Sequence, residues 1–87
     1  MKTIMTLMSN GHKIEVANSL TGTEVILYDG KEVSNKRSVT GSTHIFQVTE
    51  NDENIQYEVA IGIKMGFFSS KVWCEIRRKG EIIYTSR

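Results

Sequence analysis

Three side chains in this sequence, His12, His44 and Cys74, are the usual candidates for metal ligation or nucleophilic catalysis. A structural zinc site needs three or four ligands, and the chain has only these three soft ones. A cysteine nucleophile needs a neighbouring base and an electropositive, partly exposed setting. We therefore predict no metal, no cofactor and no catalytic residue, with His12 closing a turn and His44 beginning a strand.

Motifs that would indicate an enzyme do not occur. The chain has no Gly-x-Ser-x-Gly elbow, P-loop, Gly-x-Gly-x-x-Gly or His-Glu-x-x-His segment, each of which supplies a defined catalytic geometry. Acidic residues are scattered without a visible pair. We therefore expect a protein that is not an enzyme.

Trp73 is the only tryptophan, and it lies within a predicted strand over residues 71–77. Cys74 is expected to be a small core side chain, its commonest use. The register that buries Cys74 places Trp73 on the opposite face, with Arg77 and other charged residues. A tryptophan among charges indicates contact with a partner or ligand. Two alternatives stay open: the indole packs over the edge of a second sheet, or the register is reversed and Trp73 is in the core.

Large apolar side chains gather in a glycine-containing connection over residues 64–70, namely Met65, Phe67 and Phe68. They either fold back to cap the open end of the fold or form a contact surface. Capping is the more frequent arrangement, because exposed apolar patches are uncommon on monomers. The contact alternative predicts self-association.

Basic residues beside a tryptophan can bind single-stranded nucleic acid. The basic residues near Trp73 are Lys71, Arg77, Arg78 and Lys79. Glu75 and Glu81 interrupt them, and such binders usually show a strongly basic face. We therefore do not expect a nucleic-acid partner.

The bulk composition indicates one small globular domain over residues 1–87. The net charge of +1 gives no global reason to expect nucleic acid or an anionic membrane as a partner. A single cysteine excludes an internal disulfide and fits a reducing compartment. The N-terminal segment is too short and too interrupted for a signal peptide, and no apolar run approaches a membrane span. We expect a soluble, cytoplasmic protein.

Apolar residues recur with a period of two, and no helical period is sustained. Asn10-Gly11 and Asp29-Gly30 are hairpin signals, because a type I′ turn needs positive φ at both central residues. The expected strands cover residues 2–8, 13–17, 24–28, 31–34, 44–49, 55–63, 71–77 and 81–85. A polar connection over 36–43 and an acidic loop over 50–54 separate some of them. About eight short strands at this spacing predict an all-β fold, an antiparallel β-sandwich of two sheets, with a β-clip or a partly open barrel as the alternative.

Three stretches have a distinctive order of turns and strand starts: Asn10-Gly-His-Lys-Ile-Glu-Val16, Leu20-Thr-Gly-Thr-Glu-Val-Ile-Leu-Tyr-Asp-Gly-Lys-Glu32, and Gly41 to Phe46. In this order the chain resembles the Fas apoptosis inhibitory molecule family and a set of short bacterial domains. The resemblance implies an eight-stranded antiparallel β-sandwich without catalytic residues, and it supplies no partner. That family has a Trp and Phe cluster after the segment matching Glu32, whereas residues 33–39 here have no aromatic, so its partner contacts are not carried over.

Two functional hypotheses follow. The first is a non-catalytic β-sandwich that works through protein contacts, as an interaction module or a homo-oligomer. The second is a sandwich that binds carbohydrate or single-stranded nucleic acid by stacking on a tryptophan. The candidate contact residues are Trp73, Met65, Phe67, Phe68 and Arg77.

Overall fold

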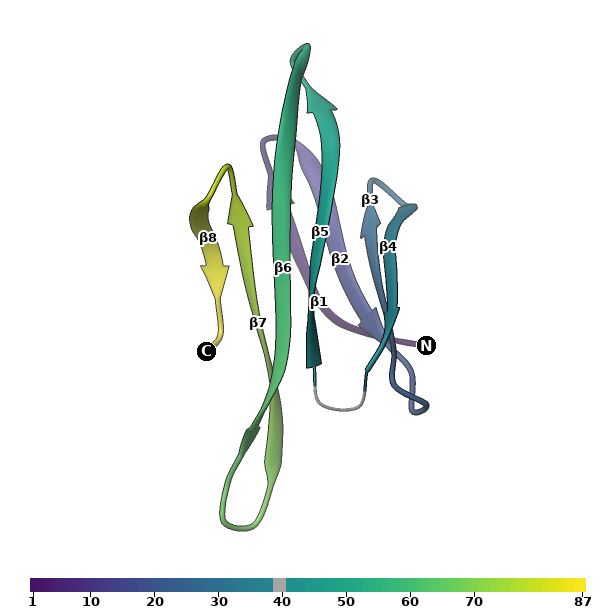
Figure 1. Cartoon of the computed structure of the whole chain (residues 1–87), viewed down its shortest axis with the longest axis vertical. Coiled ribbons are helices and arrows are strands. Elements are labelled where there is room, and N and C mark those ends of the chain that lie inside the picture. Colours follow the sequence, from purple (N-terminus) through teal and green to yellow (C-terminus); the bar gives the residue numbers. More distant parts are fainter. Residues whose placement is uncertain (39–40) are drawn as a thin grey trace. The chain divides into compact units, whose positions relative to one another are not determined.

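The computed structural model describes residues 1–38 and 41–87 of the chain (Figure 1). Within these residues the chain forms eight strands and no helix. The strands are β1 (Lys2–Ser9), β2 (His12–Asn18), β3 (Thr23–Tyr28), β4 (Lys31–Arg37), β5 (Gly41–Glu50), β6 (Glu53–Met65), β7 (Ser70–Arg78) and β8 (Glu81–Thr85). The predicted all-β class is confirmed, and every predicted strand is present.

The strands form two four-stranded sheets, in the orders β1-β2-β3-β4 and β5-β6-β7-β8. All neighbouring strands are antiparallel, and each strand pairs with the next one in the chain. The chain divides into two compact units, Met1–Val39 and Thr40–Arg87, with one sheet in each. Two antiparallel sheets are therefore confirmed, while the single domain over residues 1–87 stays a prediction.

Two-residue turns join the strands of the first sheet at Asn10-Gly11 and Asp29-Gly30. Their φ angles are 50° and 79° in the first turn and 51° and 83° in the second. Positive φ at both central residues is what a type I′ turn requires, and its twist matches that of the flanking strands. Both predicted hairpin turns are confirmed.

The predicted acidic loop over residues 50–54 is shorter than expected. Glu50 and Glu53 pair across the hairpin, so Asn51 and Asp52 alone make the turn, with φ angles of 51° and 63°. Asn and Asp tolerate this left-handed conformation better than other non-glycine residues. The polar connection predicted over 36–43 includes Val39 and Thr40, which lie outside the described residues.

β6 pairs with both β5 and β7, and buried residues alternate with more exposed ones along it from Ile55 to Ile61. Its buried apolar side chains are Ile55, Tyr57, Val59 and Ile61. Ile63 belongs to the same face but is 40% exposed. Within the described residues the last pair of β5 and β6 is Gly41 with Gly62, and Ile63 lies one residue beyond it. The apolar face of β6 therefore continues beyond the last described residue that pairs with β5.

Candidate functional site

The β6–β7 hairpin extends past the strands that flank it in the second sheet (Figure 1). β6 pairs with β5 as far as Gly62, and β7 pairs with β8 only from Glu75 onward. The two strands continue to pair with each other as far as Met65 and Ser70. Residues 63–72 therefore form a two-stranded extension, called here the β6–β7 tip.

Aromatic side chains occupy the end of the tip. Phe67 and Phe68 are each 96% exposed, and Met65 is 77% exposed. The two phenyl rings pack edge to face, with their centroids 5.1 Å apart. The Gly66 amide donates a hydrogen bond to the Ser69 carbonyl at 2.6 Å and closes the turn beneath them. The alternative in which these side chains fold back to cap the fold is therefore wrong.

The two faces of the tip differ in chemistry. On one face Ile63 and Val72 pair across the hairpin, are 40% and 45% exposed, and continue the apolar face that Met65 ends. On the other face Lys64 lies directly opposite Lys71. Sequence reasoning missed the role of these pairs, because it treated residues 64–70 as an irregular connection rather than as continued strands.

Trp73 lies at the base of the tip, on the face that also presents Lys71. It is half-buried, while its neighbour Cys74 is 1% exposed. The predicted register and the core position of Cys74 are thus confirmed, and the reversed register is wrong. The indole lies over Gly62 of β6, where an added Cβ would come within 2.3 Å of the ring. The guanidinium carbon of Arg87 lies 4.6 Å from the ring centroid, a cation–π contact.

Arg77 lies on the same face of β7, beyond Glu75. Its Nε donates a hydrogen bond to Oε2 of Glu75 at 3.3 Å, and its Nη2 forms an ion pair with the same oxygen, also at 3.3 Å. The Thr85 hydroxyl donates to Oε1 of the same carboxylate at 3.4 Å. The guanidinium of Arg77 is therefore engaged within its own sheet, and the structure does not bring it to the aromatic end of the tip.

Replacing Gly62 by alanine is expected to displace the indole of Trp73 and shift its emission to longer wavelength. The added methyl group and the ring cannot occupy the same space, so the ring moves towards water. Because Trp73 is the only tryptophan, intrinsic fluorescence reports it directly. Gly11→Ala is the control, since an added Cβ there meets nothing within 4 Å, and its emission maximum is expected to stay close to that of the wild type. An unchanged emission maximum in Gly62→Ala would contradict this packing.

His12 closes a turn, as predicted. Its Nδ1 lies 2.6 Å from Oδ2 of Asp29, and its ring stacks on Tyr28 with centroids 5.1 Å apart. The hydrogen bond from His12, followed by the one from the Lys13 amide, lowers the pKa of Asp29. These contacts hold the ends of two adjoining strands together, because Asp29 reaches from its turn to β2.

His44 does not begin a strand as predicted, because β5 starts at Gly41; it is fully buried within β5, and its Nε2 lies 3.2 Å from the Ser42 hydroxyl. Cys74, the third soft ligand, is buried in β7. Among residues 1–38 and 41–87, no group of three or more His, Cys, Asp and Glu side chains is arranged to hold a metal ion.

A buried carboxylate is the main polar feature that sequence reasoning missed. Glu50 is 2% exposed and accepts a hydrogen bond from the Tyr57 hydroxyl at 2.6 Å. Its Oε1 accepts from Nη2 and Nε of Arg78 at 2.8 and 3.1 Å. The bond to Glu50 is the main reason that the pKa of Arg78 is raised. This cluster ties the end of β5 to β6 and β7 and has a structural role.

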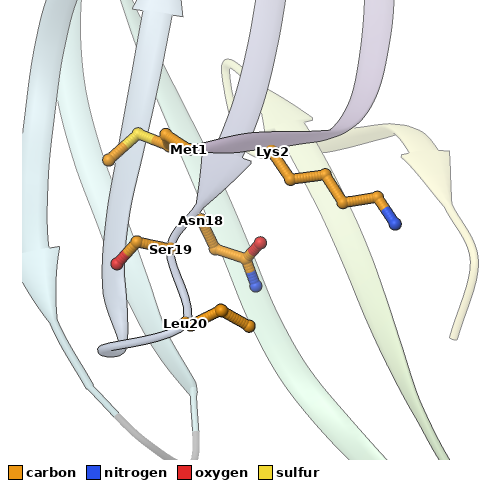
Figure 2. A pocket seen from close by; sticks show the side chains of 5 residues that line it. All are labelled: Met1, Lys2, Asn18, Ser19 and Leu20. Atoms are coloured by element: carbon orange, nitrogen blue, oxygen red, sulfur yellow. The ribbon is translucent and has the colours of Figure 1, made fainter.

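A pocket of about 520 Å³ lies in the first unit, between the start of β1 and the β2–β3 turn (Figure 2). Its lining residues are Met1, Lys2, Asn18, Ser19 and Leu20. The Ser19 hydroxyl is taken by the turn, since it contacts the Thr21 hydroxyl at 2.9 Å and accepts from the Thr23 amide at 3.2 Å. The pocket therefore presents no activated nucleophile.

No helix in the described ranges is long and apolar enough to cross a membrane. The resemblance to the Fas apoptosis inhibitory molecule family stays a prediction, because nothing in the structure tests it. Comparisons with protein-family models, with curated proteins and with solved structures found no significant match to this chain.

Proposed function

We propose that this chain is a non-catalytic binding module whose contact surface is the β6–β7 tip. In the form that the sequence predicts, the module works through protein contacts, with a partner protein or a second copy of the chain. Two further candidate contact residues lie on β7: Trp73 at the base of the tip, and Arg77 farther along the strand. The lone buried cysteine supports a reducing compartment, and we propose the cytoplasm.

The observation that supports the proposal best is the exposure of Phe67 and Phe68. Both rings are 96% exposed, and the neighbouring apolar pair of Ile63 and Val72 is exposed as well. A contiguous apolar patch on a small protein is costly in water and marks an interaction site when it is retained. Turn closure needs no aromatic side chain here, since the Gly66 amide and the Ser69 carbonyl make the hydrogen bond.

The stacking hypothesis is the weaker candidate. Gly62 lies beneath the indole of Trp73 and the Arg87 guanidinium lies over its ring. A sugar or a nucleobase would have to displace the arginine before it could stack. Carbohydrate or single-stranded nucleic acid therefore stays an alternative that needs a rearrangement.

A photo-crosslinking side chain tests the proposed function without assuming a partner. Benzoylphenylalanine is introduced at Phe68, where it replaces one aromatic by another, and at Leu20 as the matched control. Leu20 is also fully exposed but lies in the first unit. After irradiation in the native cells, adducts are expected at position 68 and not at position 20. Equal adduct yields at both positions, or none at position 68, would contradict the proposal.

A further inference from the structure

We propose that the partner of the β6–β7 tip is the surface of an anionic phospholipid bilayer. The inference rests on the proposed contact surface, the β6–β7 tip, and it puts a lipid surface in place of a protein as the occupant of that site. The two phenyl rings would enter the acyl boundary, and the lysine pair behind them would contact lipid phosphate groups.

The charge of the tip indicates an anionic partner. No Asp or Glu occurs between Glu58 and Glu75, whereas Lys64 and Lys71 lie directly opposite each other. Like charges opposite each other on one face destabilise a hairpin unless an anion neutralises them. The two lysines also line a hollow of about 220 Å³ together with Met65, Gly66 and Ser69, which offers space for a phosphate group.

The apolar end of the tip has the chemistry of an inserting loop. Phe67 and Phe68 protrude from a turn, and neither has a polar group that would need a partner in hydrocarbon. Ile63, Met65 and Val72 add apolar surface on one face only. Apolar side chains at the end, with lysines set back from it, match the sequence of layers from acyl chains to headgroups.

A second copy of the chain is the competing occupant. An isologous dimer through the face of Ile63 and Val72 would leave Lys64 and Lys71 on the opposite face without an anion, whereas a bilayer surface offers phosphate groups to both lysines. A protein partner would also need a preformed apolar pocket framed by carboxylates, whereas a fluid bilayer adapts to two protruding rings.

The net charge of the whole chain hides this distribution. Its value of +1 averages the acid-free tip with acidic residues elsewhere in the chain. Electrostatic attraction to a bilayer falls off within a Debye length, so only the charges near the point of contact matter. The expectation of no anionic membrane partner followed from the average and not from the local charge.

Vesicle co-sedimentation tests the inference with the whole chain. The probes are vesicles of phosphatidylcholine alone and vesicles that also contain phosphatidylglycerol. We expect binding to the anionic vesicles, weakened by salt, and little binding to the neutral ones. Phe67→Ser/Phe68→Ser should lower the partition coefficient by about a hundredfold, because burial of both rings is lost. Lys64→Gln/Lys71→Gln should lower it by about 25-fold, at about fivefold for each lysine.

Two control variants match these changes on the first unit. Lys31→Gln/Arg37→Gln removes the same charge from β4, and Leu20→Ser removes an exposed apolar side chain from a turn. Both should bind as the wild type does. Equal weakening by the charge controls, or equal binding to both kinds of vesicle, would overturn the lipid inference.

Failure of the inference and failure of the proposed function have different signatures. If the chain does not bind anionic vesicles but self-associates in ultracentrifugation through Phe67 and Phe68, the lipid partner is wrong and the contact function stands. The same holds if the adducts at position 68 are exclusively proteins. If vesicles are not bound and position 68 gives no adducts, both proposals are wrong.

Discussion

Replacing Gly41 by alanine is expected to lower the free energy of unfolding by about 3 kcal/mol. Gly41 begins β5 with a φ of 117°, a conformation that residues with a Cβ rarely adopt. An added Cβ would also lie 2.3 Å from the carbonyl oxygen of Ile61 and 2.8 Å from the Cα of Gly62. Because both are backbone atoms of the paired strand, relief requires β5 to move away from β6. Urea denaturation followed by far-ultraviolet circular dichroism measures the loss.

Gly30→Ala separates the two causes. Gly30 also has a positive φ, 83°, but an added Cβ there would meet nothing within 4 Å. The left-handed conformation alone should then cost about 1 kcal/mol. Equal losses in the two variants would show that the close approach of Gly41 to β6 is not a constraint, and the register of β5 would need revision.

The fold followed from local chemistry. Asn10-Gly11 and Asp29-Gly30 stand between β-rich runs and tolerate positive φ at both positions, and these pairs adopt positive φ as expected. Alternation along β6 likewise indicated which of its side chains are buried. Such signals are local, so a single sequence is enough to find them.

The candidate site depended on register between distant residues, which no local pattern specifies. Ile63 continues the buried face of β6 but is exposed, and it lies one residue beyond the last described pair of β5 and β6, Gly41 with Gly62. Phe67 and Phe68 lie beyond the residues of β6 and β7 that β5 and β8 flank. Both rings are exposed, so the capping alternative is wrong. Composition indicated an apolar segment here, but only strand pairing decides whether that segment is covered.

Glu50 was missed for a related reason. The acidic composition of residues 50–54 suggested a solvated loop, whereas β5 and β6 continue into it and turn at Asn51-Asp52. Period-two counting from Phe46 places Glu50 on the buried face of β5, with Val48 between them. The alternation along the sequence thus indicates a buried Glu50, whereas the acidic composition of residues 50–54 indicates a solvated loop. The structure agrees with the alternation.

Replacing Glu50 by alanine is expected to destabilise the second unit by about 3 kcal/mol. Its carboxylate is 2% exposed and accepts hydrogen bonds from the Tyr57 hydroxyl and from two nitrogens of Arg78. Without it, the buried hydroxyl of Tyr57 is left without this acceptor, and the guanidinium loses its counter-charge at the same point. Urea denaturation of the variant measures the loss.

Two further variants establish whether burial is the cause. Tyr57→Phe removes one donor and should cost about 2 kcal/mol, as expected for a hydrogen bond to a charged group. Once the carboxylate is absent, the same change should cost much less, because the hydroxyl no longer has an ionised acceptor. Glu53→Ala is the control, since Glu53 pairs with Lys79 at 2.8 Å near the same turn but is exposed. Exposed pairs contribute little, so a loss in Glu53→Ala as large as in Glu50→Ala would mean that the hairpin end depends on charge and not on the buried cluster.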